Sequence, residues 1–263
     1  MIVIDLGYLT SIWPDWDNYA SGSIPKSEFM RAYEEDRAAD RRLPAMRWNP
    51  IGYKSIPKDM VRAVIVAEDA NFFRHEGVDV EALKEAMEYN WEKGRVVYGS
   101  STISQQTVKN LFLSSSRNPL RKLHEYLLTF SMERHLSKRR IMELYLNIAE
   151  FGPGIYGVEA AASHYFGVSA PQLTTLQCLE LAATLPAPVN HNPRTHTRFF
   201  TKRLRKLQNQ FGYRPPEAMI GETAPTAQPS ATETITAPST TEPAAPAMDA
   251  VDAPSEIPAN PDY

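Results

Sequence analysis

Two adjacent carboxylates, Glu68 and Asp69, follow directly behind the apolar run of residues 64–67. An apolar run of this kind is typical of a core segment, whereas an ionised carboxylate is costly to bury. The end of such a segment can deliver Glu68 to a cleft, where partial burial raises the pKa of its carboxyl toward that of a useful general base. Asp69 either supports this site through hydrogen bonds or serves only the local backbone, and the sequence leaves both open.

A second charged group lies in the pentapeptide RKLHE, residues 121–125. On a helix, Arg121 and Lys122 come within reach of Glu125, at spacings of four and three residues. Two cations beside one carboxylate can hold Glu125 ionised and still offer positive charge to a phosphate. A solvated, salt-bridged helix face is the competing interpretation of these five residues taken alone.

The stretch GSSTISQQTVKN, residues 99–110, lies between these two charged groups in the chain and is rich in hydroxyl and amide side chains. Such side chains suit a sugar ligand, and a lysine suits a phosphate. The candidates for substrate contact are Ser101, Thr102, Gln106, Lys109 and Asn110. A polar loop followed by a helix cap would explain the same residues without a ligand.

The elements that must position these groups are predicted to be helices, because apolar residues recur at spacings of three and four. The segments are VDVEALKEAMEYNWEK, NPLRKLHEYLLTFSMERHL, SKRRIMELYLNIAEF and LTTLQCLELAATLPAP. Asp79 and Ser137 are expected to cap the first and third, a capping box from Thr174 to Gln177 starts the fourth, and Pro186 ends it. No segment competes with a clean two-residue alternation, so the sequence predicts a mainly α-helical domain.

The same spacing predicts which helical faces are apolar. The residues expected on them are Val80, Leu83, Met87 and Trp91 in the first helix, Leu123, Leu127 and Phe130 or Ser131 in the second, and Ile141, Leu144, Tyr145 and Ile148 in the third. The single cysteine, Cys178, allows no internal disulfide and is expected in the core.

Composition changes sharply near residue 213. The 49 residues after Arg214 hold ten of the 21 prolines, eight acidic residues and no basic one. Such a segment buries too little apolar surface to fold, so we expect a disordered acidic tail rich in Pro, Thr and Ala over residues 213–263. Residues 1–214 carry a net charge of +5, against −3 for the whole chain. This charge suits an anionic partner such as a phosphate, a diphosphate or a lipid headgroup, although it is also compatible with solubility alone.

The chain starts with the apolar segment MIVIDLGYLTSIW, which Asp5 interrupts. It is shorter than the roughly 20 residues that a membrane-spanning helix needs. Residues 1–45 are therefore predicted to be a membrane-proximal segment, either a truncated anchor or a segment resting at the membrane surface.

Five motifs in order resemble those of the glycosyltransferase domain that polymerises peptidoglycan. They are EDANFFRHEG (68–77), GSSTISQQTVKN (99–110), RKLHE (121–125), RRIMELYLN (139–147) and GIYGVEAAASHYF (154–166). The chain looks in particular like the monofunctional biosynthetic peptidoglycan transglycosylases of glycosyltransferase family 51, over residues 46–212. It departs from the family pattern at Ser100, where a second glycine commonly follows Gly99. The chain also lacks the long continuation of a transpeptidase domain, so a monofunctional enzyme is expected.

This resemblance implies a lysozyme-like, two-lobed, mainly α fold in which a smaller mobile jaw lobe faces a larger one. It implies a glycosyltransferase that polymerises lipid II, the lipid-linked disaccharide pentapeptide, into β-1,4-linked glycan strands. The transfer inverts the donor's α configuration and releases polyprenyl diphosphate, so that base and leaving group lie on opposite faces of the sugar.

The resemblance also assigns roles to individual residues. Glu68 matches the general base that takes the proton of the acceptor 4-hydroxyl, and Glu125 matches the second essential carboxylate, near the donor diphosphate. The expected substrate-binding residues are Asp69, Phe72, Ser101, Thr102, Gln106, Lys109, Asn110, Arg121, Lys122 and Asn147. No protein-bound metal or tightly bound cofactor is expected, and a divalent cation, Mg²⁺ or Mn²⁺, is a candidate for assisting the diphosphate.

The implied partners are lipid II, the growing glycan linked to polyprenyl diphosphate, the membrane and other cell wall synthesis proteins, with no nucleic acid. The implied location is the cell inner membrane, with the catalytic domain facing the periplasm. Two alternatives stay open, a lysozyme-like lytic transglycosylase and a scaffold that binds lipid II without catalysis. A lytic enzyme needs a catalytic glutamate but has no use for the RKLHE cations.

Overall fold

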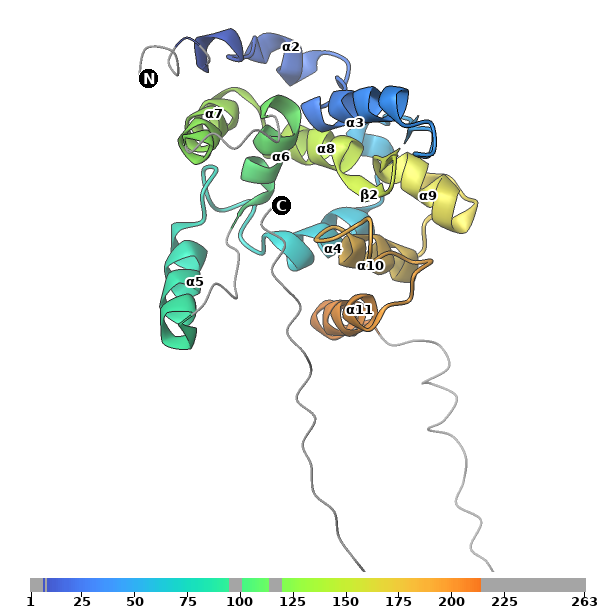
Figure 1. The fold of residues 1–263 in the computed structure, drawn as a ribbon. Helices are drawn as coiled ribbons and strands as arrows, with labels where there is room; N and C mark the ends of the chain where they lie inside the picture. Colours follow the sequence, from blue (N-terminus) through green and yellow to red (C-terminus); the bar gives the residue numbers. More distant parts are fainter. Residues whose placement is uncertain (1–6, 8, 95–100, 114–119, 214–263) are drawn as a thin grey trace, which may run out of the picture. The chain divides into compact units, whose positions relative to one another are not determined.

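The computed structural model describes residue 7 and residues 9–94, 101–113 and 120–213. These residues are mainly helical, which confirms the fold class predicted from the sequence (Figure 1). The predicted tail beyond Tyr213 and the Gly99–Ser100 departure from the second motif lie outside the described residues. The division into a large lobe and a mobile jaw lobe stays a prediction.

Helices follow one another along most of the described chain, interrupted by three short strands. In chain order the elements are α2 (Trp16–Ser21), α3 (Glu28–Ala39), β1 (Arg47–Trp48), the 3-10 helix η1 (Tyr53–Ser55), α4 (Lys58–Glu68), α5 (Val80–Lys93), α6 (Ile103–Phe112), α7 (Arg121–His135), α8 (Lys138–Ile148), β2 (Glu150–Gly152), β3 (Ile155–Tyr156), α9 (Val158–Phe166), the 3-10 helix η2 (Ala170–Gln172), α10 (Thr175–Thr184) and α11 (Arg198–Phe211).

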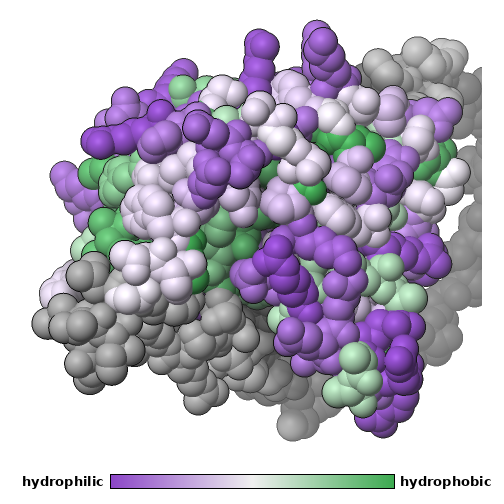
Figure 2. Space-filling model, turned by 90° about the horizontal axis from the view of Figure 1, so that it is seen from above, coloured by the Kyte–Doolittle hydropathy of each residue, from purple (hydrophilic) through white to green (hydrophobic). Residues whose placement is uncertain are grey.

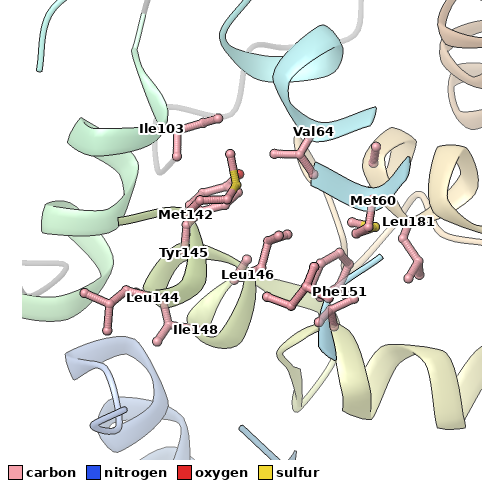
Figure 3. Close-up of a cluster of buried hydrophobic side chains, with 14 of the residues drawn as sticks. Met60, Val64, Ile103, Met142, Leu144, Tyr145, Leu146, Ile148, Phe151 and Leu181 are labelled. Atoms are coloured by element: carbon pink, nitrogen blue, oxygen red, sulfur yellow. The ribbon is translucent and has the colours of Figure 1, made fainter. Parts of the chain in front are cut away.

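Helix α8 lies at the centre of the core and packs on α6, while α10 packs on α4 (Figure 3). Its predicted apolar residues Ile141, Leu144, Tyr145 and Ile148 are all buried, behind the predicted Ser137 cap. Helix α10 starts with the predicted capping box and ends at Thr184, two residues before Pro186. A period of 3.6 residues and a cap therefore suffice to predict the two helices that the core surrounds.

Helix α7 contradicts the apolar face predicted for it. Leu123, Leu127 and Phe130 are 41–52% exposed, whereas the neighbouring face, which includes His124, Glu125, Leu128, Thr129 and Met132, is buried. The helix thus turns a partly polar face inward, because Glu125 belongs to a charged cluster at α6. The spacing of apolar residues cannot predict this orientation of α7, because it places the polar side chains of a helix on the side that faces solvent.

Helix α5 begins at the predicted Asp79 cap, whose carboxylate accepts a hydrogen bond from the Ala82 amide. Its predicted apolar face does not enter a core, because Val80, Met87 and Trp91 are 64–90% exposed. Within the described chain α5 makes no extensive packing contact with another helix, and Figure 1 draws it apart from them.

A short sheet was not predicted from the sequence. Its strand order is β1-β3-β2, with β1 parallel and β2 antiparallel to β3. The strands are only two or three residues long, with Arg47 opposite Ile155 and Glu150 opposite Tyr156. Segments this short show no readable alternation, which explains why a period-based analysis misses them.

Asn147 joins α8 to the segment that leads into α4. Its buried side-chain amide accepts from the Ile51 amide (2.8 Å) and donates to the Ile51 carbonyl (2.9 Å) and the Glu143 carbonyl (2.7 Å). Its backbone carbonyl accepts from the Trp48 indole (2.9 Å). A side chain at Gly157 would meet that carbonyl at 2.8 Å, so this close approach requires glycine. We therefore reassign Asn147 from substrate contact to support of the fold.

Helices α2 and α3, which lie within residues 1–45, pack onto the same core through Trp16 and Met30. A membrane-proximal position for residues 1–45 stays a prediction. Figure 2 shows the face seen from above as a mixture of hydrophilic and hydrophobic residues. Among the described residues, no helix is long and apolar enough to span a membrane.

Replacing Asn147 by Ala should destabilise the domain by about 2–4 kcal/mol, because the Ile51 amide and carbonyl lose their buried partner. Denaturant unfolding followed by circular dichroism measures the change. Asn209→Ala, at an exposed position of α11, is the control and should change stability by less than about 0.5 kcal/mol. Equal effects of the two substitutions would contradict this role of Asn147.

Glu150 makes stability depend on pH. Burial raises the pKa of this carboxyl from 4.5 to about 7, against a hydrogen bond from the Gly154 amide. Between these values the folded state binds more protons than the unfolded state, so the contribution is fully present below about pH 4.5 and is lost as pH rises through about 7.

The free energy of unfolding at pH 5 and pH 8 tests this role of Glu150. Relative to Glu150→Gln, the wild type should lose about 1–3 kcal/mol of stability between the two values. The exposed Glu88→Gln serves as control and should follow the wild type. A wild type and a Glu150→Gln protein with parallel pH profiles would refute the proposal.

Candidate active site

Glu68 is the last residue of α4, and its side chain is 12% exposed. The helix buries Met60, Val61, Ala63 and Val64, so the apolar run drives it into the core and brings its end to the edge of a cavity. This is the arrangement that the sequence predicted for the carboxylate behind the apolar run.

Two side chains from distant parts of the chain hold the Glu68 carboxylate. Arg203 Nη2, on α11, donates to Glu68 Oε1 at 2.5 Å and to the Ala67 carbonyl at 3.2 Å. Gln106 Nε2, on α6, donates to Glu68 Oε2 at 3.0 Å. The Tyr145 hydroxyl donates to Gln106 Oε1 at 3.2 Å, which fixes the orientation of the amide. Both carboxylate oxygens are thereby oriented.

Opposing influences set the pKa of Glu68. Burial raises the pKa of its carboxyl above the ordinary value, while the Arg203 guanidinium and the Gln106 hydrogen bond lower it and the nearby Asp69 raises it. A general base works best when its pKa lies near the operating pH. Burial with a compensating cation is a means of reaching that range.

Asp69 fixes the position of its neighbour Glu68. Its buried carboxylate accepts from His75 Nε2 at 3.0 Å and from the Ile103 amide at 3.0 Å. His75 Nδ1 accepts from the Gly77 amide at 3.1 Å, which assigns the proton to Nε2. Asp69 thus ties the end of α4 to the first turn of α6, and this supports the first of the two roles that the sequence left open.

A cavity of about 530 Å³ lies beside the two carboxylates. It is lined by Glu68, Asp69, Ala70, Asn71, Asp79, Ala82, Glu85, Ala86, Tyr89, Ser101 and Thr102. Ser101 is exposed and free to turn toward a ligand, whereas the Thr102 hydroxyl caps α6 and donates to the Gly77 carbonyl at 2.6 Å. Thr102 therefore forms part of the cavity wall with its hydroxyl already engaged.

A cationic cluster surrounds Glu125 where α7 packs on α6. Lys122 Nζ lies 2.5 Å from Glu125 Oε1, and the Glu125 side chain is only 7% exposed. Burial lowers the pKa of Lys109, the Glu125 carboxylate raises it, and Arg121 and Lys122 lower it further. Lys109 therefore lies in the same electrostatic environment as the RKLHE residues, and its role in binding a phosphate stays a prediction.

Helix α6 connects the two charged groups. Gln106, which contacts Glu68, precedes Lys109 and Asn110 by three and four residues, so the three side chains share one face of the helix. Three residues advance a helix by ~4.5 Å. The base and the cationic cluster are therefore about one helical turn apart along α6.

Phe72 does not reach the cavity. It is fully buried, its ring packs edge-on against Phe73 at a centroid distance of 5.1 Å, and Lys138 Nζ lies 4.7 Å from its centroid. We reassign it, like Asn147, from substrate contact to support, because an enclosed ring has no surface to offer a ligand.

Arg203 was missed by the sequence analysis, since it lies beyond the fifth motif. A signal was present, because Arg203 borders the apolar face of α11 that includes Phe200 and Leu207, whereas other cations of that helix lie opposite. A cation at the edge of an apolar face needs a buried partner, and here the partner is Glu68.

The sequence is similar to those of known proteins. Residues 39–211 match the family described as Transglycosylase. The chain belongs to this family. The resemblance carried by the five motifs is confirmed.

Several relatives carry the name biosynthetic peptidoglycan transglycosylase. That of Methylobacillus flagellatus is 43% identical over 187 residues, which are 71% of this chain and 82% of that protein. That of Nitrosospira multiformis is 43% identical over 190 residues, 72% of this chain and 82% of that protein. That of Bordetella avium is 44% identical over 196 residues, 73% of this chain and 80% of that protein.

Replacing Arg203 by Gln should raise the pKa of Glu68, because the cation that favours the carboxylate is lost. A base must be deprotonated to act, so the acid limb of the kcat/KM profile should move upward by about one pH unit or more. Arg205→Gln, an exposed residue of the same helix, is the control and should leave the limb in place. An unmoved limb in Arg203→Gln would show that the guanidinium does not tune the base.

Proposed function

We propose that this chain is a peptidoglycan glycosyltransferase that polymerises lipid II into β-1,4-linked glycan strands. One observation carries the proposal. The Glu68 carboxylate is held between a guanidinium and the Gln106 amide, and Lys109 of a separate cationic cluster lies about one helical turn from Gln106 on the same face of α6. The family match and the names of the relatives support the same reaction.

In the first half of the reaction Glu68 takes the proton of the acceptor 4-hydroxyl. The oxygen attacks the donor's anomeric carbon, and its new bond forms as the bond to the diphosphate breaks, with inversion from α to β. Gln106 and Arg203 orient the carboxylate and favour its ionised form against the effect of burial, which raises its pKa. Ser101, on the cavity wall, is positioned to bind sugar hydroxyls.

In the second half the polyprenyl diphosphate leaves with its negative charge. Lys109, Arg121 and Lys122 supply fixed cations where that charge grows, which is the form of electrostatic stabilisation that phosphate chemistry requires. Glu125 holds Lys122 at 2.5 Å and keeps the cations from spreading apart. Asn110, half-buried beside Lys109, is a candidate for the diphosphate oxygens.

A divalent cation stays a candidate helper of this step. The described residues contain no group of three or more His, Cys, Asp or Glu side chains suited to a metal. If Mg²⁺ or Mn²⁺ takes part, the substrate diphosphate would hold it, and the ion would add positive charge to that of the three basic side chains.

The lytic alternative is weaker on the same geometry. A lysozyme-like enzyme uses its glutamate as a protonated general acid, whereas Arg203 favours the ionised form of Glu68. It also has no leaving diphosphate for the Glu125 cluster to stabilise. A non-catalytic lipid II scaffold would not require the Tyr145–Gln106–Glu68 chain of hydrogen bonds.

Helix α5 supports contact with a membrane, which a polyprenyl-linked substrate requires. Ala82, Glu85, Ala86 and Tyr89 face the cavity. Val80, Met87 and Trp91 lie on the opposite face and are 64–90% exposed. An exposed apolar stripe that includes a tryptophan suits the lipid interface. The proposal thus extends to the inner membrane as location, with the domain on its periplasmic side.

Polymerisation of labelled lipid II in detergent tests the function. The wild type should give a ladder of products that lysozyme digests, while Glu68→Gln and Glu125→Gln should each lose at least about 100-fold in rate. Glu88→Gln, an exposed carboxylate of α5 outside the cavity lining, is the control and should keep the wild-type rate.

The other products would overturn the proposal. Shortening of preformed glycan without any ladder would establish the lytic reaction. Tight binding of lipid II with no product of either kind would establish the scaffold. An undiminished ladder from Glu68→Gln would remove the general base from the mechanism.

A further inference from the structure

Four cations line the outer side of α11. We call Arg198, Lys202, Arg205 and Lys206 the basic face of α11. All four are exposed, and they lie at spacings of three, four, seven and eight residues, so they share one side of the helix. With His196, Thr201 and Asn209 they surround a shallow hollow of about 440 Å³. The face extends about 12 Å along the helix axis.

The basic face has no carboxylate to neutralise it within the part of the chain that the structure describes. None of its four side chains belongs to an ion pair there. Like charges four residues apart destabilise a helix, and this face contains two such pairs, Arg198 with Lys202 and Lys202 with Lys206. An anionic partner would relieve this repulsion.

The inner side of the same helix belongs to the active site. Phe200 and Leu207 are buried, α11 packs on α4 and α10, and Arg203 holds Glu68 (Figure 1). The basic face is therefore fixed rigidly relative to the catalytic base. A partner bound to the outer side of α11 therefore also determines where the cavity beside Glu68 lies relative to that partner.

We infer that the basic face of α11 docks on the anionic headgroups of a lipid bilayer. The inference rests on the proposed function, because a lipid-linked substrate requires the cleft to work beside a bilayer. Four cations along one helix face match a flat anionic surface. Phe199 borders the face, is 45% exposed and packs at a tilt against His191 at a centroid distance of 4.5 Å, so an aromatic ring accompanies the cations.

Docking of this face would hold Glu68 at a constant height above the headgroups. The donor diphosphate lies at the headgroup level of the bilayer, since its polyprenyl chain is in the hydrocarbon. The basic face of α11 is thus a positioning surface, distinct from the apolar stripe of α5, because it depends on the charge of the lipid.

Co-sedimentation with vesicles tests the docking. Wild type and the variant with Arg198, Lys202, Arg205 and Lys206 all replaced by Gln are compared on phosphatidylcholine alone and on phosphatidylcholine with phosphatidylglycerol. The variant should bind the anionic vesicles at least about tenfold more weakly. Wild-type binding should fall with added salt, which screens exposed charges.

The matched control removes four charges elsewhere. Arg41, Lys54, Arg134 and Arg139 are exposed, and replacing them by Gln gives the same net charge as the test variant. The control should lose less than about threefold in binding, since the charges that touch the lipid are intact. Equal losses in the two variants, or none in the test variant, would overturn the docking.

Two further measurements keep the test decisive. Lipid II polymerisation in neutral detergent should be the same for wild type and both variants, so a wild type without activity would refute the proposed function and leave the docking result standing.

If the fourfold variant does not fold, Lys202→Gln with Lys206→Gln replaces it. This double variant should lose about threefold or more in binding, and wild-type binding by it would overturn the docking.

Discussion

The Glu68 carboxylate lies where burial opposes its charge, and the rest of the site is arranged around keeping it ionised and aimed. Removing a carboxylate from water costs far more than one hydrogen bond returns. The compensation comes from α6 and α11, which lie far from α4 in the sequence and meet at its end. A small displacement of any of these helices would leave the buried charge of Glu68 without a partner. Accurate packing of α4, α6 and α11 is therefore a condition for the chemistry of the site.

Buried polar groups hold these helices in register. Asp69 links α4 to the start of α6, and Asn147 links α8 to the segment before α4. Each uses all or most of its hydrogen-bonding capacity inside the protein, so it specifies one arrangement where apolar packing alone would tolerate several. Glu133 follows the same rule between Ser104 and Lys138. Asp69 and Asn147, which lie within the sequence motifs, thus fix the positions of helices around the site.

Helices α5, α7, α8 and α10 and the caps of three of them could be predicted from the sequence, because caps and a 3.6-residue period are local signals. The buried face of α7 could not be predicted, because it carries Glu125, whose charged neighbours include a residue of another helix that no local pattern reveals. Phe72 and Asn147 lie in motifs, which made contact with substrate a natural inference, yet both are enclosed. Arg203 shows the reverse case, a residue outside every motif that reaches the catalytic base.

The distance in sequence between Glu68 and Arg203 has a consequence for biosynthesis. A ribosome delivers α4 early and α11 only 135 residues later, so the nascent chain spends most of its synthesis with the catalytic carboxylate unpaired. During that interval the helices that bury Glu68 have not yet assembled, so neither the burial nor the cation that together set its pKa is present. The active site is therefore completed only when α11 has been made, and the five motifs, which end at residue 166, do not by themselves supply every group that holds Glu68.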